Sequence, residues 1–115
     1  IPLKFLSNKL MKAIPLTQET FEATFASTDL PVLVEFWAEW CGPCQQLGPI
    51  VDQLATEQEG RAIVAKVEVD AAPDLARRFN IRSIPTLLIF KNNEAVGLLR
   101  GVQPKSALAD ALAAA

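Results

Sequence analysis

The only two cysteines of the chain, Cys41 and Cys44, are separated by two residues in the stretch VEFWAEWCGPC. Such a pair could be half of a zinc site, an inert structural disulfide or a reversible dithiol–disulfide centre. Zinc needs about four ligands, and this chain has no further cysteine and no histidine. A disulfide that closes so short a loop restricts the unfolded chain very little. We therefore favour the reversible centre, which exchanges disulfides through a mixed-disulfide intermediate.

The two cysteines lie where an apolar stretch gives way to a helical pattern. We expect Cys41 just before the first helical turn, where free N–H groups and the helix dipole stabilise negative charge. The thiolate is the reactive form, so Cys41 is the predicted nucleophile and Cys44, one turn further in, the resolving thiol. Gly42 lets another backbone approach closely. Pro43 fixes the start of the helix.

Glu35 stands six positions before Cys41 in an otherwise apolar run. One interpretation is that strand twist brings it to a solvated edge, but its apolar flanks argue against this. Burial disfavours the charged form of a carboxylate and raises its pKa, so a buried Glu35 could exchange a proton near neutral pH. Cys44 must lose a proton to attack and regain it later. We therefore predict that Glu35 is the proton acceptor and donor, since histidine, the commonest such group, is absent.

Strand-like and helix-like patterns alternate along the chain. Strands are predicted at 12–16, 31–38, 61–70, 85–91 and 94–101, and helices at 17–27, 43–59, 72–80 and 103–115. The strand at 31–38 is apolar on both alternating sets, which is typical of a central strand covered on both sides. The expected fold class is α/β, with a central mixed β-sheet sandwiched between helices. The first helix should lack a capping box because Thr20 follows Thr17 at the third position, and Gly60 should close the second helix.

Length and composition indicate one globular domain: 115 residues, 50% hydrophobic, 21% charged, net charge -2. This balance offers no basic face for nucleic acid, and no apolar run reaches the length of a membrane-spanning helix. Residues 1–10 are predicted to be an N-terminal extension or residues left by the expression vector, with the domain at 11–115. They lack a signal peptide's apolar core and cleavage site, so we expect a cytoplasmic protein.

The segment WAEWCGPC resembles the active-site motif of the thioredoxin family, and the likeness extends over about residues 12–114. VAKVEVD, FNIRSIPTLLIFKN and LLRGVQPKSAL resemble later segments of that family in order and spacing. The resemblance implies the thioredoxin fold and a protein-disulfide reductase that acts as a monomer on disulfide-containing client proteins. It also implies that electrons come from NADPH through a separate thioredoxin reductase. The chain itself has no Gly-rich dinucleotide fingerprint, so no bound cofactor is expected.

The resemblance also implies roles for individual residues. The Ile84–Pro85 peptide bond should be cis and face the cysteines, with the Ile84 backbone pairing with the substrate strand. Lys66 should lie near Glu35, although the family usually has aspartate at the position of Glu35. The flat apolar contact surface around Cys41 would be formed by Trp40, Gly42, Ile84, Gly101 and Val102.

Three further positions near the predicted contact surface are harder to interpret. Trp37 is expected in the core rather than on the contact surface. Ser83 and Arg100 depart from the small or apolar residues common in the family, and Arg100 could either select partners or be a harmless rim charge. Two alternatives remain open: a reductant dedicated to one pathway, and a non-catalytic binding module that uses the apolar patch alone.

Overall fold

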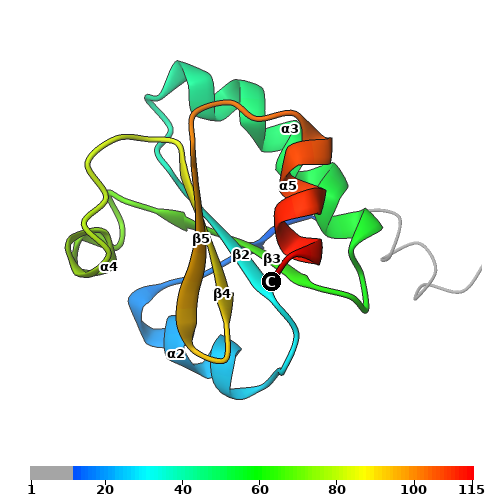
Figure 1. Ribbon diagram of the computed structural model, residues 1–115. Coiled ribbons are helices and arrows are strands. Elements are labelled where there is room, and N and C mark those ends of the chain that lie inside the picture. Colours follow the sequence, from blue (N-terminus) through cyan, green and yellow to red (C-terminus); the bar gives the residue numbers. More distant parts are fainter. Residues whose placement is uncertain (1–11) are drawn as a thin grey trace, which may run out of the picture.

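The computed structural model describes residues 12–115, and its elements follow the predicted order β-α-β-α-β-α-β-β-α (Figure 1). The strands are β1 (Ile14–Pro15), β2 (Val32–Trp37), β3 (Ile63–Glu68), β4 (Thr86–Lys91) and β5 (Glu94–Arg100). The helices are α2 (Gln18–Ala26), α3 (Gly42–Glu57), α4 (Pro73–Arg78) and α5 (Lys105–Ala113). The prediction of an extension at 1–10 with a domain start at Met11 lies outside the described residues.

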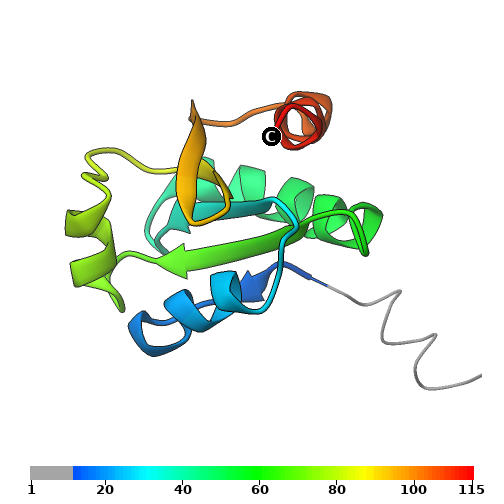
Figure 2. The ribbon, with the colours of Figure 1, turned by 60° about the horizontal axis from the view of Figure 1, so that its bottom comes forward.

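The five strands form one mixed sheet in the order β1-β3-β2-β4-β5. The pairs β1–β3 and β2–β3 are parallel, whereas β2–β4 and β4–β5 are antiparallel. Figure 2 shows α2 and α5 on opposite sides of this sheet. The predicted α/β sandwich is therefore confirmed, and β2 lies at its centre.

The two sets of apolar side chains on β2 enter two separate cores, as the double apolar pattern predicted. Val32, Val34 and Phe36 pack in the core that also holds residues of α2 and α4. Leu33 packs in the other core, together with residues of α3 and α5. Side chains alternate along a strand, so Glu35 shares the α3 side of the sheet with Leu33. The sequence thus directs one carboxylate toward the helix that begins at the cysteines.

Local details correct three of the predictions. The first helix does have a capping box: the N–H of Thr20 donates to Oγ1 of Thr17, and the N–H of Thr17 donates to Oγ1 of Thr20. A threonine hydroxyl accepts a backbone hydrogen bond as a Glu or Gln side chain would. Helix α3 ends at Glu57, before Gly60, whose positive φ of 81° belongs to the following turn. Strand β1 is only two residues long, shorter than the predicted strand at 12–16.

Candidate active site at the start of helix α3

Cys41 is the N-cap residue of α3, and Cys44 lies in the first turn of that helix. The two sulfur atoms are joined in a disulfide, with their Cα atoms 5.2 Å apart. The backbone N–H of Cys44 donates to Sγ of Cys41 across 3.2 Å. Pro43, in the first turn of the helix, has no N–H to satisfy. Because free helix N–H groups and the dipole favour negative charge, this position stabilises a Cys41 thiolate once the disulfide is reduced.

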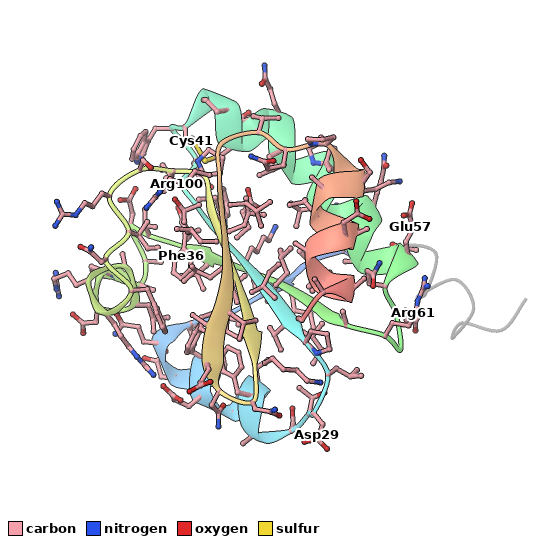
Figure 3. The ribbon with its side chains drawn as sticks, in the orientation of Figure 1. Asp29, Phe36, Cys41, Glu57, Arg61 and Arg100 are labelled. Carbon is pink, nitrogen blue, oxygen red and sulfur yellow. A yellow bond between two sulfur atoms is a disulfide. The ribbon has the colours of Figure 1, made fainter. Side chains whose placement is uncertain are left out.

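Both cysteines are buried, Cys41 with 5% and Cys44 with 3% of its surface exposed. Figure 3 places Cys41 at the beginning of α3, at one end of the sheet. The apolar residues that pack around the pair include Trp37, Val69 and Ile84. These neighbours exclude water from the sulfur atoms while leaving the helix start at the surface.

Glu35 is buried in the middle of β2, with 3% of its surface exposed. Its Oε2 atom has no hydrogen-bond partner in the described part of the chain. Glu35 lines a cavity of about 430 Å³ whose wall also includes Cys44, Gly48, Asp52 and Lys66. Glu35 and Cys44 therefore line the same cavity.

Burial raises the pKa of Glu35 from 4.5 to about 7, because a buried carboxylate loses its hydration. The positive charge of Lys66 opposes this rise, whereas the negative charge of Asp52 adds to it. Lys66 is the register partner of Glu35 on β3, but its ammonium group lies over the ring of Trp37, 5.3 Å from the centroid. Because burial outweighs the attraction of Lys66, Glu35 can gain or lose a proton near neutral pH.

The loop before β4 approaches the disulfide from the other side. The Ile84–Pro85 peptide bond is cis. The carbonyl oxygen of Ile84 lies 3.7 Å from Sγ of Cys41. The N–H of Gly101 donates to the carbonyl oxygen of Pro85 across 2.9 Å, which fixes the end of β5 beside this loop. Three segments distant in the sequence thus meet at Cys41.

The surface around Cys41 exposes large apolar side chains. Trp40 is 70% and Val102 43% exposed. A groove of about 420 Å³ lies beside Trp40 and is lined by Trp40, Val69, Ala76, Ile81, Arg82, Ser83 and Ile84. The indole N–H of Trp40 donates to Oδ2 of Asp70 across 2.8 Å, which holds the exposed ring in place. An exposed apolar patch beside a reactive sulfur is typical of a site that binds other proteins.

Reasoning from the sequence missed two residues of this site, Asp52 and Asp70. Asp52 lies on α3 and lines the Glu35 cavity, and its Oδ1 accepts a hydrogen bond from the N–H of Ala13. Asp70 holds Trp40 from a segment 30 residues away. In the sequence both resemble ordinary surface acids. The one available signal was the spacing of Cys44 and Asp52, which places both on the same side of the predicted helix. Trp37, expected in the core, is half-buried and lines the cavity as well.

Comparison with known proteins agrees with this geometry. The sequence profile of the family described as Thioredoxin matches residues 12–114. The chain belongs to the thioredoxin family. Thioredoxin 1 of a Nostoc species is 45% identical to it over 100 residues, which cover 87% of this chain and 94% of the relative. Thioredoxin 2 of Chlorobaculum tepidum is 44% identical over 107 residues, covering 93% and 95%.

A solved structure supports the same assignment. A mutant thioredoxin from Halobacterium salinarum NRC-1 superposes with a TM-score of 0.80 at 36% identity, and the match covers 90% of this chain and 89% of that one. The chain therefore has the thioredoxin fold. It is a thioredoxin-type protein-disulfide reductase, in which the Cys41/Cys44 pair alternates between dithiol and disulfide to reduce client proteins.

Thioredoxins work with a reductase and with disulfide-containing targets, and the family carries no cofactor. Within residues 12–115, no group of three or more histidine, cysteine or acidic side chains is placed to hold a metal ion. The same part of the chain includes no helix of the length and apolarity that crossing a membrane requires.

Proposed function

We propose that Cys41 is the attacking thiol and Cys44 the resolving thiol. The Cys41 thiolate attacks one sulfur of a client disulfide, forming a mixed disulfide and releasing the other client sulfur as a thiolate. Cys44 then loses its proton and attacks Sγ of Cys41, which forms the intramolecular disulfide and releases the second client thiolate. Two electrons pass from the protein to the client. The observation that carries this order is the location of Cys41 at the N-cap of α3, with the N–H of Cys44 donating to its sulfur.

Glu35 supplies the proton transfer that the second step needs. Its pKa of about 7 lets it accept the Cys44 proton near neutral pH and return it when the disulfide is reduced again. Lys66 moderates that pKa from the neighbouring strand. Glutamate in place of the usual aspartate carries one more methylene, so its carboxyl group reaches further into the cavity shared with Cys44. The support is the common cavity together with the Oε2 atom of Glu35, which has no hydrogen-bond partner among residues 12–115.

Client proteins dock on the apolar surface around Cys41. An extended client segment pairs with the backbone of Ile84, whose carbonyl oxygen lies 3.7 Å from the attacking sulfur. The cis bond to Pro85 positions that carbonyl group. Gly42 and Gly101 leave room for the client backbone, since neither carries a side chain. Trp40 and Val102 cover the client's apolar side chains, consistent with their exposure.

The remaining parts of the proposal follow from the family. A separate thioredoxin reductase restores the dithiol with electrons from NADPH. The protein acts as a cytoplasmic monomer, and its catalytic domain spans residues 11–115 with residues 1–10 as an extension. The reductase and the monomeric state rest on likeness to the family, and the domain bounds rest on the sequence around Met11. One relative, the M-type thioredoxin of Spinacia oleracea, is described as chloroplastic.

A trapping experiment tests the order of the two thiols. Reduced Cys44→Ser protein is mixed with a disulfide-bonded peptide, and adducts are measured by mass spectrometry before and after dithiothreitol. We expect a covalent adduct at Cys41 that dithiothreitol releases. Cys41→Ser is the matched control and should form none at an equal protein concentration. If Cys41→Ser forms the adduct instead, the two thiols have the opposite roles.

The binding-module alternative predicts something different. A module would retain client proteins on its apolar surface when both cysteines are replaced by serine, and would not consume disulfides. Reduction of the client disulfide by wild type, together with loss of client retention in the double variant, excludes it.

A further inference from the structure

Arg100 is a charged residue at the edge of the docking surface. It ends strand β5 opposite Thr86, and the next residue, Gly101, is hydrogen-bonded to the carbonyl oxygen of Pro85. Its side chain is exposed, and it forms no ion pair within residues 12–115. Figure 3 shows Arg100 at the same end of the sheet as Cys41.

A second cation without an ion pair in the described residues belongs to the loop that precedes β4. Arg82 lines the groove beside Trp40, two residues before Ile84. Its Nε donates to the neutral Oδ1 of Asn80 across 3.1 Å, and it too forms no ion pair in the described part of the chain. The nearby acid Asp70 is engaged by the indole of Trp40. A client strand laid along Ile84 therefore lies near two arginines, Arg82 in the groove and Arg100 at the end of the strand next to Pro85.

What sets Arg100 and Arg82 apart is their place beside the docking surface, since other cations of the described residues, such as Arg61, also form no ion pair. The ion pairs found in the described residues are Arg77–Asp74, Arg78–Glu22 and Lys105–Glu57. The chain carries a net charge of -2, so two unpaired arginines beside an otherwise apolar surface run against its overall balance. Charges at the rim of an interface act mainly on partner choice and association rate.

We propose that Arg100, together with Arg82, selects client disulfides whose flanking residues are acidic. This inference rests on the proposed docking of clients along Ile84. The occupant is an extended, disulfide-bonded segment with an aspartate or glutamate beside the cysteine that Cys41 attacks. Opposite charges raise the association rate of such a segment and hold it in register, whereas a lysine at that place is repelled.

The test uses three otherwise identical disulfide-bonded peptides with aspartate, serine or lysine next to the attacked cysteine. Reduced protein is mixed with each, and the second-order rate constant for reduction of the peptide in a single turnover is measured at low and high salt. For wild type we expect the aspartate peptide to exceed the lysine peptide by about two- to fivefold at low salt, the range of exposed ion pairs. Because salt screens exposed charges, the ratio should fall toward one at about 1 M salt.

Charge reversal supplies the decisive comparison. In Arg100→Glu the aspartate-to-lysine ratio should fall to about one, because Arg82 remains and opposes the new negative charge. Arg61→Glu is the matched control: it changes the net charge equally, and Figure 3 shows Arg61 at the opposite end of the molecule from Cys41. Its ratio should equal that of wild type. An unchanged ratio in Arg100→Glu, or an equal change in Arg61→Glu, overturns the proposal.

The serine peptide separates this proposal from the function on which it rests. If wild type reduces the serine peptide but shows no charge preference, only the selection by Arg100 fails. If wild type reduces none of the three peptides, the docking and reductase scheme fails with it. Circular dichroism of both variants verifies that each is folded.

Discussion

Replacing Glu35 by glutamine should change how the stability of the oxidised protein depends on pH. The carboxyl group has a pKa of about 7 in the folded chain, against 4.5 for an ordinary glutamate. Each unit of pKa difference corresponds to about 1.4 kcal/mol between the two protonation states. Ionised Glu35 therefore costs the fold about 3 kcal/mol relative to its neutral form. Glutamine has almost the same shape and cannot ionise.

Whether stability rises or falls with pH depends on whether the folded or the unfolded chain binds the Glu35 proton more tightly. Below about pH 4.5 the carboxyl is neutral in both states and contributes no penalty. Between pH 4.5 and 7 the unfolded chain ionises while the folded chain keeps its proton, so wild type loses stability as pH rises. Above about pH 7 both states are ionised and the loss is complete. Any cost of the glutamine amide in the cavity is the same at every pH.

Urea unfolding followed by tryptophan fluorescence measures this difference. We expect the free energy of unfolding of Glu35→Gln, minus that of wild type, to grow by about 3 kcal/mol between pH 4 and 8. Glu94→Gln, at an exposed acid on β5, is the matched control and should show a constant difference. A constant difference for Glu35→Gln as well would refute the argument, because it would mean that the carboxyl group titrates alike in both states.

Three further predictions follow from single contacts. Asp52→Asn should lower the pKa of Glu35 and Lys66→Met should raise it, because each variant removes a charge that acts on that carboxyl group. NMR titration of the Glu35 side chain measures both pKa values. If neither value changes, these two charges do not act on Glu35 through the cavity. Thr17→Ala should lower the free energy of unfolding by about 1 kcal/mol through loss of the α2 cap, and urea unfolding with no change would show that the cap is dispensable. Gly101→Ala should lower the free energy of unfolding by about 1–2 kcal/mol because φ is 78° there, although a Cβ would meet no neighbour. An unchanged free energy in urea unfolding would show that the turn relaxes.

The order of strands and helices was predictable because it depends on local patterns. The double apolar face of the central strand required that helices cover both sides, and both cores are present. Element ends were less predictable, as the short β1 shows. The capping box at Thr17 was wrongly excluded because the usual pattern names Glu or Gln at the third position, whereas any side chain with a well-placed acceptor oxygen suffices.

The candidate site divides in the same way. Cys41 and Cys44 could be assigned from the sequence because their relation depends on one helical turn. The neighbours of Glu35 could not, since the pKa of a buried acid depends on what packs over it. Asp52 influences that pKa from a helix and Lys66 from a neighbouring strand, and neither has a local pattern that reveals it.

The sequence by itself determined the chemistry: two thiols at the start of a helix, and an acid in an apolar strand beneath them. Only the tertiary structure decided the environment of that chemistry. Chain segments far apart in the sequence bring Ile84 to within 3.7 Å of the Cys41 sulfur and place Arg100 beside the same loop. The physical reason is that residue type and spacing set reactivity within one helical turn, whereas burial, cavity shape and charge balance arise when separate elements pack together.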